Sequence, residues 1–252
     1  MRPTIIAGNW KMFKDLEESH DLVKGILERL TSTLNSVKVV ICPPYTSLAL
    51  ASKMLKESTV GLGAQNMSEH DEGAYTGEIS GRMLLSAGCR YVIVGHSERR
   101  QYFKESDALI NRKALRALEL GLVPIICVGE TLDQREKGTT HSVVRGQIEG
   151  VLKGFSAEQV STSIIAYEPV WAIGTGKTAS PEQAQEVHAL IRSVVEKIAG
   201  REAADKVVLQ YGGSVKPDNA KSLLAQKDID GALVGGACLK AESFVQIIES
   251  AV

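Results

Sequence analysis

The sequence predicts an α/β fold in which strand and helix units close into a (β/α)₈ barrel. Short β-rich runs alternate with longer segments of helical periodicity, and most of these runs are continuously apolar. Continuous apolar runs are typical of parallel strands that are covered on both faces. A chain of 252 residues suits one such barrel. Since no linker or shift in composition divides the sequence, we expect a single domain over residues 1–252.

The predicted strands are short and apolar, and most are rich in β-branched residues. They cover residues 4–8, 37–42, 60–64, 91–95, 123–128, 163–167, 206–211 and 231–235. A doubly wound open sheet would show a similar alternation of strands and helices. The GxGxxG motif expected after its first strand is absent, however, which favours the barrel.

The segments between the strands include several with the apolar spacing of amphipathic helices. The clearest are residues 15–30, 106–120, 181–198 and 241–248. Ser180, Pro181 and Glu182 offer an N-cap, a proline at the first helical position and an acidic first turn. Gly121 and Gly200 stand where C-terminal caps are expected.

The composition is that of a soluble globular protein, with 44% hydrophobic and 23% charged residues. The formal net charge is -1, and no run of like charges could follow a nucleic-acid backbone or an anionic membrane. The four cysteines are scattered and are expected to be reduced thiols. The N-terminus resembles neither a signal peptide nor a membrane span. We therefore expect a cytoplasmic protein without nucleic-acid or membrane partners.

Active sites of (β/α)₈ barrels are built from the carboxyl ends of the strands and from the loops that follow them. The polar residues at those positions are Asn9, Lys11, Gln65, Asn66, His96 and Glu168. Taken singly, most have a structural interpretation. A lone lysine after a strand is usually solvated, because its amine reaches water. An isolated histidine more often has a structural role than a catalytic one.

Glu168 and His96 are the candidates for proton transfer. Glu168 ends an apolar run and precedes Pro169, whose ring favours extended geometry in the residue before it. A carboxylate there is costly to bury without a partner, and it could abstract a proton α to a carbonyl group. His96 precedes a predicted helix, whose positive end disfavours an imidazolium. His96 could therefore act as a neutral hydrogen-bond donor.

Glycine-rich turns follow the last two predicted strands, at YGGS (residues 211–214) and at Gly235 and Gly236. Each alone is consistent with an ordinary turn. Barrel enzymes often hold a phosphate with backbone N–H groups at these two positions, so the pair favours a phosphate site.

The segment PVWAIGTGK, residues 169–177, combines apolar side chains with glycines. We interpret it as a lid that closes over a substrate. A surface loop packed in one position is the alternative that the sequence leaves open.

Together these motifs resemble those of the triosephosphate isomerase family over essentially the whole chain. They are GNWK with Asn9 and Lys11, VGHSERR with His96, AYEPVWAIGTGK with Glu168, YGGS with Ser214, and LVGGA with Gly235. The resemblance implies a TIM barrel and an aldose–ketose isomerase, an intramolecular oxidoreductase that needs no cofactor and no metal. Its implied substrates are dihydroxyacetone phosphate and D-glyceraldehyde 3-phosphate, in glycolysis and gluconeogenesis.

The resemblance also implies roles for individual residues. Glu168 is expected to be the base that moves a proton between C1 and C2, and His96 the neutral electrophile, a pairing taken from the family itself. Lys11 and Asn9 are expected to stabilise the enediolate. Substrate contacts are expected at Asn9, Lys11, Gly174, Ser214, Gly235 and Gly236.

The stretch that begins at Gln65 and ends in EGAYTGE resembles the protruding third loop of this family. The resemblance implies a homodimer in which Thr76 of one subunit lies near Lys11 and Asn9 of the other.

Two other functions stay open on the residues alone. One is another phosphate-binding barrel enzyme, such as a Schiff-base aldolase that uses Lys11. The other is a non-catalytic barrel, which would be expected to have lost the base. The sequence has no cluster of histidines and carboxylates at metal-ligand spacing. The presence of Glu168, His96 and Lys11 together favours the isomerase.

Overall fold

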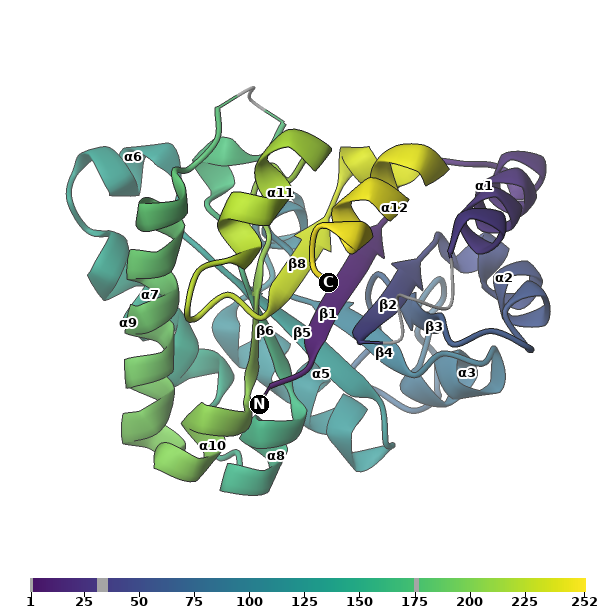
Figure 1. The fold of residues 1–252 in the computed structure, drawn as a ribbon. Helices are drawn as coiled ribbons and strands as arrows, with labels where there is room; N and C mark the ends of the chain where they lie inside the picture. Colours follow the sequence, from purple (N-terminus) through teal and green to yellow (C-terminus); the bar gives the residue numbers. More distant parts are fainter. Residues whose placement is uncertain (1, 31–35, 175–176) are drawn as a thin grey trace.

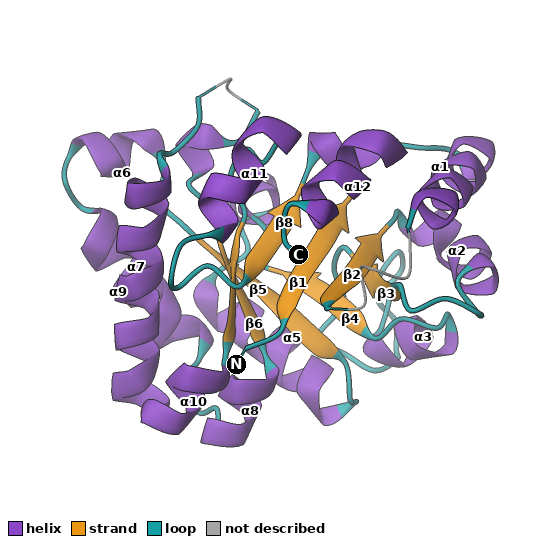
Figure 2. Cartoon of the chain, viewed as in Figure 1, coloured by secondary structure: helices purple, strands orange, loops and turns teal. Residues whose placement is uncertain are grey.

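The computed structural model describes residues 2–30, 36–174 and 177–252. Its strands are all parallel and close into a barrel in chain order, with helices around the outside (Figures 1 and 2). This arrangement confirms the predicted (β/α)₈ barrel. The strands are β1 (Thr4–Asn9), β2 (Val37–Cys42), β3 (Gly61–Ala64), β4 (Tyr91–Val94), β5 (Val123–Val128), β6 (Ile164–Tyr167), β7 (Val208–Tyr211) and β8 (Gly231–Val234).

The barrel closes where the first strand pairs with the last. β1 pairs with β2, with Thr4 opposite Val37, and with β8, with Ile5 opposite Gly231. A Cβ atom built on Gly231 would lie only 1.9 Å from the carbonyl oxygen of Ile5. Glycine is therefore the residue that lets the two strand backbones approach at the closure.

Helices cover the outer face of the barrel, as the orange strands inside the purple helices of Figure 2 show. The predicted helices at residues 15–30, 106–120, 181–198 and 241–248 correspond to α1, α5, α9 and α12. The α-helices are α1 (Leu16–Arg29), α2 (Leu48–Met54), α3 (Gly81–Ser86), α4 (Ser97–Tyr102), α5 (Asp107–Glu119), α6 (Leu132–Glu136), α7 (Thr140–Val151), α8 (Ala157–Thr162), α9 (Pro181–Ala199), α10 (Arg201–Lys206), α11 (Pro217–Leu224) and α12 (Ala241–Glu249).

The predicted helix caps are confirmed. The Ser180 hydroxyl accepts a hydrogen bond from the backbone N–H of Gln183 at 3.2 Å, and Pro181 is the first residue of α9. Gly200 caps the end of α9 with a φ of 84°, and Gly121 follows α5 with a φ of 82°. Among the described helices, none combines the length and apolar character needed to cross a bilayer.

Two apolar layers explain why the strand sequences are continuously hydrophobic. On β6, Ile164 and Ala166 belong to a cluster inside the barrel, whereas Ile165 and Tyr167 belong to the larger cluster outside it. Both faces of β6 are thus buried, as in other parallel sheets. The four cysteines are buried and free, as expected for reduced thiols.

Candidate active site

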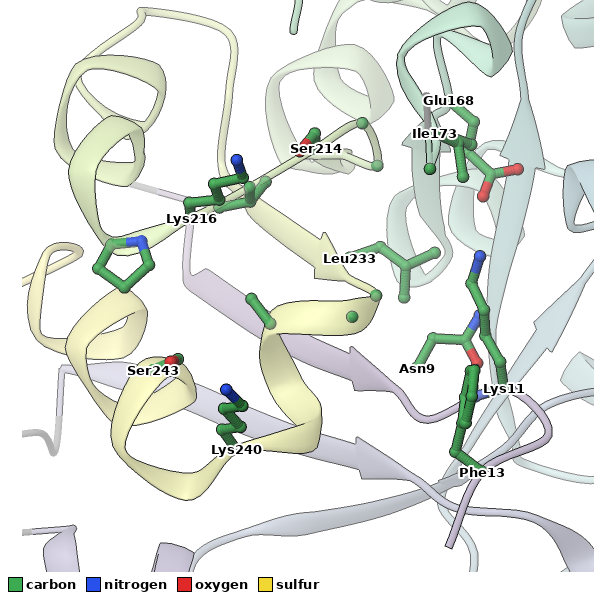
Figure 3. Close-up of a pocket in the computed structure, with 18 of the residues that line it drawn as sticks. Asn9, Lys11, Phe13, Glu168, Ile173, Ser214, Lys216, Leu233, Lys240 and Ser243 are labelled. Carbon is green, nitrogen blue, oxygen red and sulfur yellow. The ribbon is translucent and has the colours of Figure 1, made fainter. Parts of the chain in front are cut away.

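A cavity of about 770 Å³ opens where the carboxyl ends of the strands meet. In Figure 3, Asn9 and Lys11 lie side by side, Glu168 lies beyond the Lys11 ammonium, and Ser214 lies across the cavity from them. Gln65 and Asn66, which follow β3, do not line this cavity. The structure brings all the predicted catalytic and substrate-binding residues to its wall: Asn9, Lys11, His96, Glu168, Gly174, Ser214, Gly235 and Gly236.

Lys11 is held at the cavity by contacts to its backbone and its side chain. Its φ of 52° is unusual for a residue with a side chain. The backbone N–H of Lys11 donates to Asn9 Oδ1 at 3.0 Å, and Gln65 Nε2 donates to the carbonyl oxygen of Lys11 at 2.8 Å. Its Nζ lies 2.6 Å from Glu98 Oε1, and only 21% of the side chain is exposed. Lys11 is therefore fixed in place, unlike a freely solvated surface lysine.

His96 sits at the N-terminus of α4, as predicted, and its hydrogen bonds identify a tautomer. Nδ1 accepts a hydrogen bond from the backbone N–H of Glu98 at 3.2 Å. Nε2 lies 2.9 Å from Glu168 Oε1. A neutral imidazole has one donor and one acceptor nitrogen, so this arrangement places the proton on Nε2. The proton therefore lies on the nitrogen that contacts the candidate base.

Glu168 follows β6 and is almost completely buried, with 2% exposed. Its Oε2 accepts a hydrogen bond from the backbone N–H of Ser97 at 2.8 Å. On its other side, a Cβ atom built on Gly212 would lie 2.9 Å from Glu168 Cγ. The first glycine turn therefore leaves the space that this side chain occupies.

The pKa values of His96 and Glu168 shift in opposite directions. Burial alone would lower the pKa of His96, but the Glu168 carboxylate outweighs burial and raises it. Burial alone would raise the pKa of Glu168, but His96 and the Ser97 N–H outweigh burial and lower it. The Glu98 carboxylate, 3.4 Å from Nδ1, also raises the pKa of His96, but the Glu98 N–H opposes protonation because a protonated Nδ1 has no lone pair to accept its hydrogen bond. We assign a neutral His96 and an ionised Glu168 on this geometry.

The second glycine turn lies beside Lys11. A Cβ atom on Gly235 would lie 3.5 Å from Lys11 Cε. A fixed cation next to backbone N–H groups can bind an anion, and Glu168 on the same cavity wall can move a proton. Within residues 2–30, 36–174 and 177–252, no group of three or more histidine, cysteine, aspartate or glutamate residues could hold a metal ion.

Several residues of this site were not assigned a role from the sequence. The sequence indicates only a helix start at Ser97 and Glu98, yet these residues contact Glu168, His96 and Lys11. Glu130 was not singled out, although it follows the apolar strand β5. Glu130 is the second residue after that strand, so the rule that identified Glu168, a carboxylate directly after a buried strand, finds Glu130 only if it is extended by one residue.

Comparisons with known proteins cover nearly the whole chain. Residues 4–251 match the family described as Triosephosphate isomerase. Proteins named triosephosphate isomerase are similar from end to end. The one from Chloroherpeton thalassium is 54% identical over 251 residues, covering 100% of both chains. The one from Herpetosiphon aurantiacus is 55% identical over 248 residues, covering 98% of this chain and 99% of the relative. The one from Carboxydothermus hydrogenoformans is 54% identical over 252 residues, covering 100% of both.

The opposed pKa shifts predict that Glu168→Gln lowers the pKa of His96. The amide keeps the shape of the carboxyl group but removes its charge, so burial is no longer outweighed. The measurement is an NMR pH titration of the imidazole nitrogens. His188, whose pKa is lowered by burial, serves as the control and should stay neutral in both proteins. An unchanged pKa of His96 would show that Glu168 does not raise it.

Proposed function

This chain belongs to the triosephosphate isomerase family, and from that premise we propose how its own residues interconvert dihydroxyacetone phosphate and D-glyceraldehyde 3-phosphate. The reaction is an aldose–ketose isomerisation through an enediolate. The observation that carries the proposal is the buried contact between Glu168 and His96, on the wall of a cavity that also contains Lys11 and both glycine turns.

Glu168 is the base that removes a proton from C1 and returns it to C2. Its present partners, His96 and the Ser97 N–H, lower its pKa. When the carboxylate turns to the substrate it leaves these partners, while burial, which raises the pKa, remains. The pKa of Glu168 therefore rises when its carboxylate faces the substrate, which makes it a stronger base for the proton transfer.

His96 is the neutral electrophile. Its Nε2–H donates to the substrate carbonyl once Glu168 has turned away, and the bond from the Glu98 N–H keeps Nδ1 unprotonated. A neutral imidazole can give this proton to one enediolate oxygen and then take a proton from the other oxygen, which restores the neutral ring.

Other groups on the cavity wall stabilise the negative charges of the enediolate and of the phosphate. The Lys11 ammonium and the Asn9 amide face the enediolate, where fixed charges and dipoles in a water-poor site act strongly. Backbone groups at the lid and the two glycine turns bind the phosphate, through Gly174, Ser214, Gly235 and Gly236.

We also propose that the reaction serves glycolysis and gluconeogenesis in the cytoplasm. Four free cysteines fit a reducing compartment. Cell fractionation with an antibody against the protein tests this location, and recovery outside the cytoplasmic fraction would contradict it.

Shortening the base is the direct test of the mechanism. Glu168→Asp should leave the fold intact and lower kcat by about a hundredfold, because a displacement near 1 Å spoils proton transfer. KM should change little. The measurement is a coupled assay with glyceraldehyde 3-phosphate and no added cofactor, together with thermal unfolding.

Two outcomes of these measurements, and a separate borohydride experiment, distinguish the rival functions. If Glu168→Asp lowers the unfolding temperature along with kcat, the loss of activity reflects a loss of stability, and Glu168 is structural. An intact protein with no isomerase activity would favour the non-catalytic barrel. Borohydride with substrate would trap a covalent adduct only if Lys11 formed a Schiff base, which an enediolate mechanism does not require.

We propose that residues 169–177 close over the substrate. In the described part of this segment, Val170–Ala172 forms a short 3-10 turn, and Ile173 and Gly174 line the cavity. Thr175 and Gly176 belong to the lid interpretation and lie outside the described residues. Closure would exclude water and bring the Gly174 N–H to the phosphate.

The lid should protect the intermediate as well as speed the reaction. An enediolate phosphate exposed to water expels its phosphate and forms methylglyoxal, so enclosure opposes this loss. Deleting residues 172–175 should lower kcat sharply and raise methylglyoxal per turnover, as measured by product partitioning from dihydroxyacetone phosphate. A slower enzyme with an unchanged methylglyoxal fraction would mean that the segment only aids binding.

We propose that the protein acts as a homodimer through the loop that carries Thr76. Residues 72–78 of this loop are exposed. Large apolar side chains are also exposed on the segment after β1 and at the end of α4, including Met12 at 94% and Tyr102 at 68%. Exposed apolar groups of this size favour a surface that a second copy covers.

Thr76→Arg should give a monomer of much lower activity. The added charge and bulk oppose insertion of the loop, and the partner's Lys11 and Asn9 lose the support that Thr76 provides. Sedimentation velocity gives the assembly state, and the coupled assay gives activity on the same sample. A fully active monomer would contradict this coupling.

A further inference from the structure

The carboxylate of Glu130, two residues after the end of β5, is completely buried, with 0% exposed. The Tyr167 hydroxyl lies 3.1 Å from both of its oxygens, Trp171 Nε1 donates to Oε1 at 2.9 Å, and Arg135 Nη1 donates to Oε1 at 3.2 Å. A buried carboxylate without compensation is costly. Among these three side chains, only Arg135 carries a positive charge.

Arg135 also contacts Trp171 directly. The guanidinium carbon lies 4.6 Å from the centre of the Trp171 ring, within the range of a cation–π contact. The indole N–H donates to Glu130, and the indole ring lies against the cation that pairs with Glu130. Arg135 comes from the short helix α6, outside the lid segment.

The residues held by this cluster flank the proposed base. Tyr167 precedes Glu168 in the chain, and the backbone N–H of Val170 donates to the carbonyl oxygen of Glu130 at 3.0 Å. Trp171 lies in the turn that leads to Ile173 and Gly174, which line the cavity. The position of the indole therefore sets where the lid begins.

We propose that Arg135 is a positioning residue for the lid. It does not line the cavity, so it acts through Glu130 and Trp171 and not on the substrate. Without its charge, Glu130 keeps the hydrogen bonds from Tyr167 and Trp171 but loses the cation that pairs with it, and the indole loses its contact with the guanidinium. The start of the lid then occupies a wider range of positions, so Gly174 reaches the phosphate less often. The catalytic part of this inference rests on the proposed isomerase function.

The kinetic test compares Arg135→Gln, Arg135→Lys and the wild type. The glutamine variant should lose roughly tenfold in kcat, less than the ~100-fold expected for a base displaced by 1 Å. Its methylglyoxal fraction should rise, and KM should change less than kcat. Lysine keeps the positive charge but lacks the planar guanidinium group, so Arg135→Lys should partly restore kcat and the methylglyoxal fraction. Arg145→Gln, at an exposed position on α7, is the matched control and should behave as the wild type.

A second measurement follows the indole without relying on activity. The chain has two tryptophans, so 5-fluorotryptophan labelling gives two ¹⁹F NMR signals, which Trp171→Phe assigns. In Arg135→Gln the Trp171 signal should shift and broaden, whereas the signal of the fully buried Trp10 should stay unchanged. Thermal unfolding shows whether the variant is folded, and the lysine variant replaces it if it is not.

The two measurements separate the possible failures. An unchanged Trp171 signal in the folded variant would overturn the contact that the inference requires. A changed signal with wild-type kcat and methylglyoxal fraction would overturn the positioning role. A wild-type protein without isomerase activity would overturn the proposed function, while the NMR result would still test how Arg135 holds Trp171.

Discussion

The closure of parallel strands into one ring is the constraint on which the site depends. All the strands run in the same direction around the barrel, so their carboxyl ends meet at one rim (Figure 1). Asn9 and Gly236 come from opposite ends of the chain, yet they line the same cavity because β1 pairs with β8. The apolar interior and outer layers keep the strands in register, so the polar residues that follow them have fixed positions.

Two buried carboxylates that follow neighbouring strands differ in their partners, and this difference suits one to move toward a substrate and the other to stay in place. Glu168, after β6, is held by a histidine assigned as neutral and a backbone N–H. Glu130, after β5, binds three side chains, including the guanidinium of Arg135. Among these partners only Arg135 carries a full positive charge, which adds an ion-pair attraction to the hydrogen bonds of Glu130. Glu168 can therefore exchange its partners for a substrate more easily, whereas Glu130 is suited to hold the chain on either side of the base.

The first residues of α4 contact the proposed catalytic groups at the rim of the barrel. Lys11 pairs with Glu98, and the N–H of Glu98 bonds to His96. One helix start thus connects the fixed cation to the proposed electrophile, while the next residue back, Ser97, binds the base. Two adjacent residues at the start of α4 thus orient the proposed catalytic groups: Glu98 contacts Lys11 and His96, and Ser97 contacts Glu168.

The sequence by itself determined the order of the strands, the four most clearly amphipathic helices, the caps of α9, and which residues stand at the strand ends. These features depend on local patterns, since apolar runs, Pro181 and Gly200 act within a few residues of their position. The family motifs added the expected roles of Glu168, His96 and Lys11. Only the tertiary structure decided which partners meet: Gln65 supports Lys11 from outside the cavity, and Arg135 lies against Trp171. Such contacts join segments far apart in the chain, and their distances depend on barrel closure and side-chain packing, which no local pattern encodes.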